Sequence, residues 1–555
     1  MIYVVGPMNK EQRTKNKERG SDAGSLFVFC FLFFVPCLLL AACTCTPRPP
    51  APDQGPPVVV VDPDEESLTP ATPETEPNDT QQRAQPLAQG EWIEAKMAAK
   101  DADWFRFTIK QDGQVARVQV RGVTGLDLAL EAYNNQGKRL VKVDNAREGG
   151  GEVLVNLSVE PGAYLLRVSE VKGRPGTLPY RVGFSLRARE EGEEVEPNWK
   201  AAMATPLAPD QEAVGYLGWR TDNDWYQVDV SSISPSARLR VELDGVDGVR
   251  ANLSVRTADG KILAERWTGT GDGAVLANLV PPEASQGPLM VVVRCREQTN
   301  VETRYYLRVM SAVPAGLTEQ EPNDTPDQAT TLLTGQALAG LLLDRYDRDL
   351  YRIPAEEVRW VSLKVRPPMG LDLELALLDS AGKPVWTVNA AGVRLPEEMP
   401  ALLVAPPGAV VRVRAVTLDQ VSGQSPYVIS ARTMPGAGLE AEPNDTPALA
   451  SDARAAGRWP IRGFIHPGED KDHFKLLAES SRLRLVARSP GGAGMRLSLL
   501  DLAGRSLASV TAERGGEEIV LEADVTGGQE YLLELLDPAG KGQVDEAYTI
   551  VRENP

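Results

Sequence analysis

The stretch Leu371–Gly382, which reads LDLELALLDSAG, decides the fold class of this chain. Apolar and polar residues alternate from Leu371 to Leu377, and this period of two is typical of a β-strand with one buried face. The segment Asp379–Gly382 follows and has the Asp-x-x-Gly composition of a tight turn. The stretch therefore predicts a half-buried strand that enters a hairpin.

The same strand and turn occur four times, which makes an internal repeat the main organising feature of the sequence. The turns end at Gly137, Gly260, Gly382 and Gly504. Each copy begins with a Glu-Pro-Asn segment, at offsets of 120, 125 and 121 residues: Glu76–Thr80, Glu196–Lys200, Glu321–Thr325 and Glu442–Thr446. An Asp-x-Asp-x-aromatic segment follows, and the last strand of each copy begins near Tyr180, Tyr305 or Tyr306, Tyr427 and Tyr548.

Each copy of about 120 residues contains short alternating segments separated by Gly, Pro, Asn and Asp, without long amphipathic helices. This pattern predicts an all-β fold of four β-sandwiches in tandem, because a unit of this size can bury its own core. We expect the domains to span residues 74–190, 191–316, 317–437 and 438–555. Short connections between the copies predict restricted joints.

The N-terminus has the pattern of a bacterial secretion signal: basic residues before position 20, then the apolar run Leu26–Leu40. The segment Leu40-Ala41-Ala42-Cys43 resembles a lipobox, which implies a signal peptide over residues 1–42 and a lipid on Cys43. A cleaved signal with an incidental cysteine is the alternative. Thr44 fits transfer to the outer membrane, whether periplasmic or surface-exposed. Residues 43–73 are rich in proline and predict a semi-rigid tether.

The repeated marks, together with the strand entry Gly162-Ala163-Tyr164, resemble the bacterial pre-peptidase C-terminal (PPC) domain. That family is similar to the collagen-binding domains of clostridial collagenases. The resemblance covers nearly all of residues 74–555. It implies jelly-roll-like sandwiches that are non-catalytic and serve secretion, targeting or binding.

Carboxylates recur at the start of each copy. In an extended segment, Glu74, Glu76 and Asn78 project to one face. Several converging carboxylates repel unless a cation neutralises them, and hard oxygen ligands suit Ca²⁺. The collagenase-type resemblance implies calcium ligands at Glu74, Glu76, Asn78, Asp79, Asp101, Asp103, Glu319, Glu321, Asn323, Asp324, Asp347, Asp349, Glu440, Glu442, Asn444, Asp445, Asp470 and Asp472. In the second copy Trp199 replaces the aspartate, so we expect a weak or empty site there.

A purely structural role for the same residues stays open. Asn-Asp-Thr is also a cap or Asx-turn signature, and a proline restricts the preceding glutamate to an extended conformation. The Asp-x-Asp-x-aromatic segment can turn a strand edge while its ring enters the core.

Composition limits the function. The chain has 555 residues and a net charge of -18, which argues against a nucleic-acid partner. It has two histidines, His466 and His473, and no zinc, nucleophile-elbow or phosphate-loop motif, so we expect no enzyme. We expect Cys295 to be a buried small hydrophobe.

The leading hypothesis is a lipid-anchored envelope protein that binds or scaffolds a protein, matrix or polysaccharide partner. The alternatives are a stalk without a ligand and, remotely, an accessory to a hydrolase or an enzyme.

Overall fold

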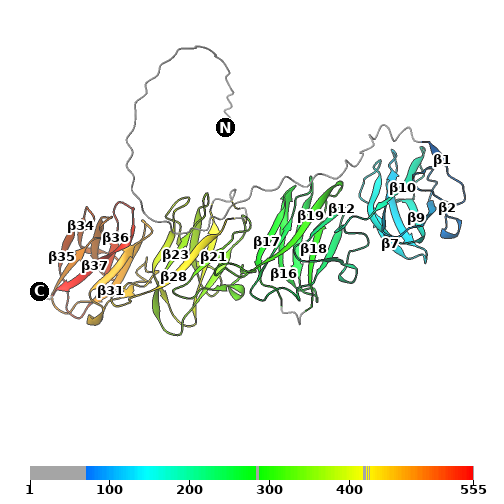
Figure 1. Cartoon of the computed structure of the whole chain (residues 1–555). Coiled ribbons are helices and arrows are strands. Elements are labelled where there is room, and N and C mark those ends of the chain that lie inside the picture. The colour runs from blue at the N-terminus through cyan, green and yellow to red at the C-terminus, as the bar shows by residue number, and fades with distance from the viewer. Residues whose placement is uncertain (1–69, 283–286, 417–420, 422, 424, 554–555) are drawn as a thin grey trace, which may run out of the picture. The chain divides into compact units, whose positions relative to one another are not determined.

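The computed structural model describes residues 70–282, 287–416, 421, 423 and 425–553. The predicted signal peptide, Cys43 and the tether up to residue 69 lie outside these residues. The described chain is all-β, and Figure 1 shows four sandwiches, each made of two facing sheets. The predicted fold class is confirmed. We call the sandwiches modules 1 to 4.

Module 1 pairs a sheet of order β1-β3-β10-β5-β8 with a sheet of order β2-β4-β9-β6-β7. A single 3-10 turn, η1, precedes β2. The elements are β1 (Ala71–Pro73), η1 (Gln81–Arg83), β2 (Gln85–Pro86), β3 (Trp92–Ala95), β4 (Ala102–Ile109), β5 (Gln114–Arg121), β6 (Leu128–Asn134), β7 (Arg139–Val143), β8 (Glu152–Val159), β9 (Gly162–Glu170) and β10 (Tyr180–Ala188).

Module 2 repeats this arrangement with the sheets β11-β13-β18-β15-β16 and β12-β19-β14-β17. Its elements are η2 (Ala201–Met203), β11 (Thr205–Leu207), β12 (Glu212–Leu217), β13 (Asn223–Val228), β14 (Arg238–Leu243), β15 (Arg250–Arg256), β16 (Ile262–Thr270), β17 (Ala274–Leu279), β18 (Leu289–Cys295) and β19 (Asn300–Ala312).

Module 3 has the sheets β20-β22-β27-β24-β25 and β21-β28-β23-β26. Its elements are η4 (Pro326–Gln328), β20 (Thr330–Thr331), β21 (Ala337–Gly340), β22 (Asp349–Pro354), β23 (Arg359–Arg366), β24 (Leu373–Leu378), β25 (Pro384–Val388), β26 (Glu397–Val404), β27 (Gly408–Ala415) and β28 (Tyr427–Met434).

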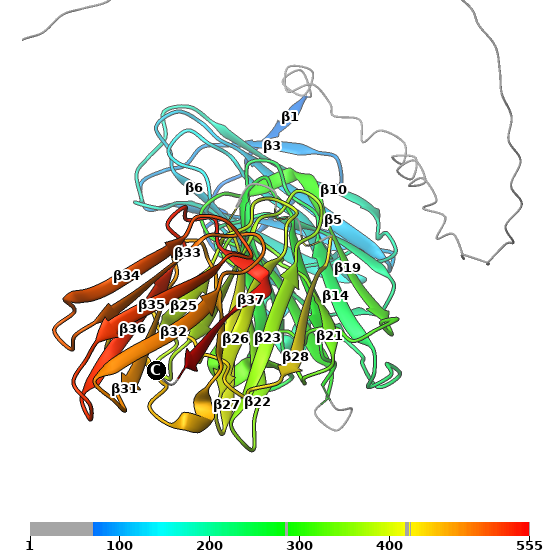
Figure 2. The same ribbon diagram turned by 90° about the vertical axis from the view of Figure 1, so that its left-hand side faces the viewer.

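Module 4 has the sheets β29-β31-β36-β33-β34 and β30-β37-β32-β35, and its strands β31 to β37 are labelled in Figure 2. Its elements are β29 (Ser451–Asp452), η6 (Ala456–Arg458), β30 (Ile461–Ile465), β31 (Lys471–Leu477), β32 (Arg482–Arg488), β33 (Met495–Leu500), β34 (Ser506–Ala512), β35 (Glu518–Asp524), β36 (Glu530–Leu536) and β37 (Gln543–Glu553).

The alternating stretch that opened the sequence forms β24 and its hairpin to β25, as predicted. Leu373 and Leu375 are fully buried in the core of module 3, while Glu374 lies on the opposite face of the strand and is 6% exposed. The turn closes with a hydrogen bond from Gly382 N to Asp379 O at 3.0 Å, and Gly382 has a φ of 76°. Glycine meets that positive φ without a side-chain clash.

Each module has a hydrophobic core of its own between its two sheets. Cys295 is 3% exposed within the core of module 2, as expected for a small hydrophobe. Among the described residues, no helix is long and apolar enough to cross a membrane.

Adjacent modules are joined by backbone pairing. The Glu-Pro-Asn segment that enters modules 2, 3 and 4 forms a parallel bridge with the edge strand β8, β17 or β26 of the module before it, as the pairs Leu157–Glu196, Leu279–Glu321 and Leu402–Glu442. Ser158 N donates to Glu196 O at 2.8 Å, and Glu196 N donates to Asn156 O at 3.0 Å. The joints are therefore restricted by direct contacts.

Candidate metal centre

The entry segment of each module carries a cluster of carboxylates that we call the cage. A cage consists of the two glutamates and the asparagine of the entry segment with the second aspartate of Asp-x-Asp. The four cages are Glu74, Glu76, Asn78 and Asp103; Glu194, Glu196, Asn198 and Asp224; Glu319, Glu321, Asn323 and Asp349; and Glu440, Glu442, Asn444 and Asp472. In each cage the three carboxylates offer oxygens that lie within 4.8 Å of one another.

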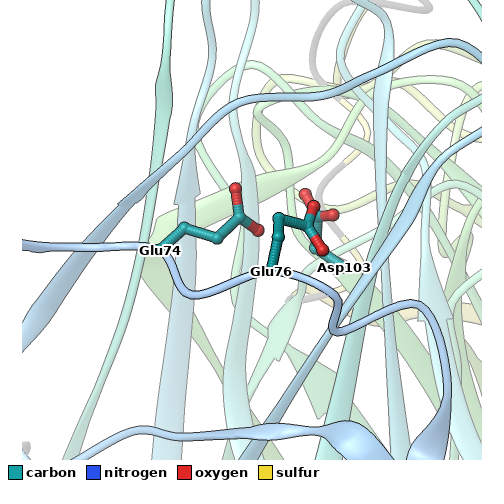
Figure 3. A group of neighbouring side chains, drawn as sticks. All are labelled: Glu74, Glu76 and Asp103. Atoms are coloured by element: carbon teal, nitrogen blue, oxygen red, sulfur yellow. The ribbon is translucent and has the colours of Figure 1, made fainter.

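Figure 3 shows the module 1 cage, with the carboxyl groups of Glu74, Glu76 and Asp103 directed toward one another. Asn78 binds both glutamates: its Nδ2 donates to Glu74 Oε1 and its backbone N to Glu76 Oε2, each at 2.8 Å. Glu74 also accepts a hydrogen bond from Lys96 N at 2.9 Å. The entry segment thus folds back on itself, and the predicted common face of Glu74, Glu76 and Asn78 is present.

The last strand of each module contributes a tyrosine to the cage. Tyr427 donates to Asp349 Oδ2 at 2.5 Å, and Tyr351 donates to Glu319 Oε2 at 2.9 Å. Gly340 faces these rings, and a Cβ there would lie 2.4 Å from Tyr427 Oη. A glycine is needed at this position because the tyrosine approaches so closely. In the same way Tyr180 donates to Asp103 and Tyr305 to Asp224, whereas Tyr548 donates to Glu440 Oε2.

One oxygen on several cage residues is buried without a hydrogen-bond donor. In module 3 these atoms are Glu321 Oε1, Asn323 Oδ1 and Asp349 Oδ1. Modules 1, 2 and 4 repeat the pattern with Asn78 Oδ1, Asp103 Oδ1, Glu196 Oε1, Asn198 Oδ1, Asp224 Oδ1, Glu442 Oε1 and both oxygens of Asp472, whereas Asn444 presents its Nδ2. A buried acceptor without a donor costs about 1–3 kcal/mol. The recurrence of such oxygens in four modules indicates that the cages bind a group other than a hydrogen-bond donor of the protein.

Electrostatics agree with that interpretation. Burial, together with the nearby carboxylates of Asp347 and Glu319, raises the pKa of Glu321 to about 9. Burial likewise raises the pKa of Asp103 to about 8 and that of Asp224 to about 7. Among the described residues, no ion pair is found to a cage carboxylate. A divalent cation would supply the missing positive charge, and three carboxylates with an amide oxygen match the hard ligands that Ca²⁺ prefers.

The first aspartate of Asp-x-Asp accepts hydrogen bonds from the backbone, unlike the second aspartate, which belongs to the cage. Asp101 accepts a hydrogen bond from Ala98 N at 2.8 Å, Asp222 from Gly218 N at 2.7 Å and Asp470 from His466 N at 2.8 Å. Asp347 accepts one from Leu343 N in the same way. These aspartates hold the loop before the strand, as the structural alternative expects, and their role as calcium ligands stays a prediction.

The aspartate that follows the entry asparagine differs between modules. Asp445 groups with Glu442 and Asp470 in a second set of potential ligands, whereas Asp79 and Asp324 join no such set among the described residues. In module 2 Trp199 is 49% exposed and its position leaves Glu194, Glu196 and Asp224 together. The geometry therefore offers module 2 the same three carboxylates, and weaker binding there remains a prediction.

The preceding module helps to close the later cages, which the sequence did not reveal. Asn156 of β8 donates from Nδ2 to Glu194 O at 3.2 Å and to Glu194 Oε1. Asn278 of β17 donates to Glu319 Oε1 at 3.0 Å. In module 4, the Trp360 indole donates to Glu440 O. Glutamates in the cages of modules 2 to 4 are at most 7% exposed, whereas Glu76 of module 1 is exposed.

The two histidines do not join a cage. His473 is 3% exposed, and its Nε2 lies 3.5 Å from Glu534 Oε2. His466 is half-buried, and burial lowers its pKa.

Comparisons with known proteins add little. No family model matches the sequence, and no curated protein matches it. Solved structures that share similarity include the tandem CBM22-1 and CBM22-2 domains of Paenibacillus barcinonensis Xyn10C, with 14% identity, 40% of this chain and 85% of that chain covered, and a TM-score of 0.14. The M60 catalytic domain with CBM51-1 and CBM51-2 of Clostridium perfringens ZmpB has 10% identity, covers 81% and 55%, and also has a TM-score of 0.14. Scores this low carry no argument about function.

Proposed function

We propose that this chain is a non-catalytic scaffold of the bacterial cell envelope, anchored by a lipid on Cys43, whose four modules each hold a structural Ca²⁺. The tandem sandwiches present binding surfaces to a protein or polysaccharide partner outside the membrane. The sequence resemblance to PPC domains supports both the non-catalytic role and the calcium.

The recurrence of the buried cage in all four modules carries this proposal. In modules 2 to 4 the cage carboxylates are almost completely shielded from solvent. A substrate could not reach them without unfolding of the entry segment, so their position suits a structural ion better than catalysis. The ion would be held by the two glutamates, the asparagine and the aspartate, and it would offset their mutual repulsion.

A stalk without a ligand is the second candidate. The backbone pairing between each entry segment and the preceding edge strand favours it, because such joints suit a spacer. The two functions differ in whether any face of the modules has affinity for envelope material.

Thermal unfolding of a soluble form that begins at residue 70 tests the cation. Millimolar CaCl₂ after removal of metal with a chelator should raise the melting temperature, because a ligand of the folded state stabilises it. Equal melting in calcium and chelator would refute the structural ion. Retention of the same protein on isolated envelope and extracellular polymers, beside an albumin control, separates the scaffold from the bare stalk.

A further inference from the structure

Module 2 carries a face rich in arginine and tryptophan on the outside of its five-stranded sheet. Trp225 of β13 and Trp267 of β16 are half-buried there. The Arg256 guanidinium lies 5.7 Å from the centre of the Trp225 ring, and those of Arg250 and Arg294 lie 5.5 and 5.3 Å from the centre of Trp267. We call these five residues the Arg–Trp face.

Two arginines of this face are fixed by a hydrogen bond from Nε. Arg256 Nε donates to Ser254 Oγ at 3.2 Å, and Arg250 Nε donates to Thr268 O at 3.2 Å. In the part of the chain that the structure describes, neither arginine forms an ion pair. Arg294 reaches Glu265 at 3.4 Å. The face therefore keeps positive charge on a protein whose net charge is -18.

Modules 1 and 3 neutralise arginines on the equivalent face. Glu131, 4% exposed, binds Arg139 and Arg167 at 2.7 and 2.6 Å. The hydrogen bonds from these arginines overcome the effect of burial and lower the pKa of Glu131.

Glu374 of module 3 has the same role. It is 6% exposed and binds Arg412 and Arg414 at 2.8 and 2.5 Å. Counted back from the hairpin turn, module 2 has Ser254 in the place of Glu131 and Asn252 in the place of Glu374. Module 2 thus carries arginines on this face without the central carboxylate.

We propose that the Arg–Trp face binds a polysaccharide that carries carboxylate groups, such as a chain of uronic acids. This inference rests on the proposed scaffold function and names its ligand class. Guanidinium groups pair with carboxylates through two parallel hydrogen bonds, and indole rings pack against the apolar faces of sugars. Trp225 and Trp267 are three strands apart by pairing, about 14 Å at the usual strand spacing, so the polymer crosses the strands.

The negative net charge of the protein favours a carboxylated glycan over a nucleic acid as the ligand of this face. A nucleic acid has a phosphate on every nucleotide and would meet the acidic remainder of the protein along its length. A carboxylated glycan distributes its charge among neutral sugar surfaces, and these suit tryptophans placed between arginines.

Affinity electrophoresis of the soluble chain from residue 70 through gels with polygalacturonate tests the proposal. Neutral dextran and single-stranded DNA serve as the comparison polymers. The wild type should be retarded by polygalacturonate alone, and less so at high salt. The Arg250→Gln and Arg256→Gln double variant should bind at least tenfold more weakly, a loss of about 1.4 kcal/mol, since it removes two guanidinium groups that donate charge-assisted hydrogen bonds.

Arg167→Gln is the matched control, because Arg167 lies on the equivalent face of module 1 and is already paired with Glu131. It should leave retardation unchanged. Unaltered melting of both variants shows that they are folded. Absence of retardation of the wild type, an equal loss in the control, or stronger retardation by DNA would overturn the inference. Retention on envelope material that survives such a result would leave the scaffold function standing.

Discussion

Replacing Asp103 by Asn tests the cage through the sign of the stability change. Asp103 is fully buried, its Oδ1 has no donor among the described residues, and its Oδ2 accepts the Tyr180 hydroxyl at 2.5 Å. Burial raises the pKa of this carboxyl to about 8 from 3.8, against the lowering effect of that hydrogen bond. Without a cation, stability is greatest below the ordinary pKa and is lost as the pH rises toward 8.

The magnitude follows from this shift. At pH 7 the folded state retains a proton about three pH units above the ordinary pKa, and at ~1.36 kcal/mol per unit this costs ~4 kcal/mol relative to the unfolded chain. Asparagine removes the cost but also removes a charged ligand. Asp103→Asn should therefore stabilise module 1 by up to ~4 kcal/mol in chelator at pH 7 and destabilise it in millimolar calcium.

Urea unfolding of a fragment spanning residues 70–190 measures both values, since module 1 has its own core. Asp112→Asn is the control, because Asp112 is exposed and lies outside the cage. This variant fragment should have nearly the stability of the wild type both in chelator and in calcium. If Asp103→Asn lowers stability equally in chelator and calcium, the carboxylate is only a hydrogen-bond acceptor and the cation reasoning is refuted.

Without cations, the whole chain should lose stability as the pH rises from about 4 to 9, because the pKa of Glu321 is raised to about 9 and folding opposes loss of its proton. Calcium should flatten this slope in thermal scans, and a slope unchanged by calcium would contradict the cage. Asn156→Ala removes two donors to Glu194 and should cost about 2 kcal/mol at the first joint, seen as faster proteolysis between modules 1 and 2. Ala401 occupies the matching position at the joint between modules 3 and 4. Ala401→Gly should therefore not speed cleavage between modules 1 and 2. Cys43→Ser should move the chain from the membrane to the soluble fraction, and continued membrane association would count against the lipid anchor.

The fold was predictable because its signals are local. Alternation in Leu371–Leu377 and the turn at Gly382 depend on neighbouring residues, and repetition multiplied this evidence by four. The shared face of Glu74, Glu76 and Asn78 followed from the same local geometry. The tyrosine that marks each last strand was visible as a pattern, but the arrival of its hydroxyl at the cage depends on the pairing of distant strands.

The closure of the cages by the preceding module could not be predicted. Asn156 and Asn278 read as ordinary strand residues until β8 and β17 are placed beside the next entry segment. The different tasks of Asp101 and Asp103 were also hidden, because they depend on whether a backbone amide or a tyrosine hydroxyl lies nearer. Equal spacing in the sequence did not imply equal roles.

The parallel pairing of Glu196 with Leu157 has a mechanical consequence. The entry segment is the covalent link between two modules and also holds part of the cage, so tension along the chain passes through the residues that would bind the ion. Pulling a module away from its neighbour would separate Asn156 from Glu194 and open the cage to water. Calcium would then resist extension at each joint, and the calcium concentration around the protein would set the force at which the joints yield.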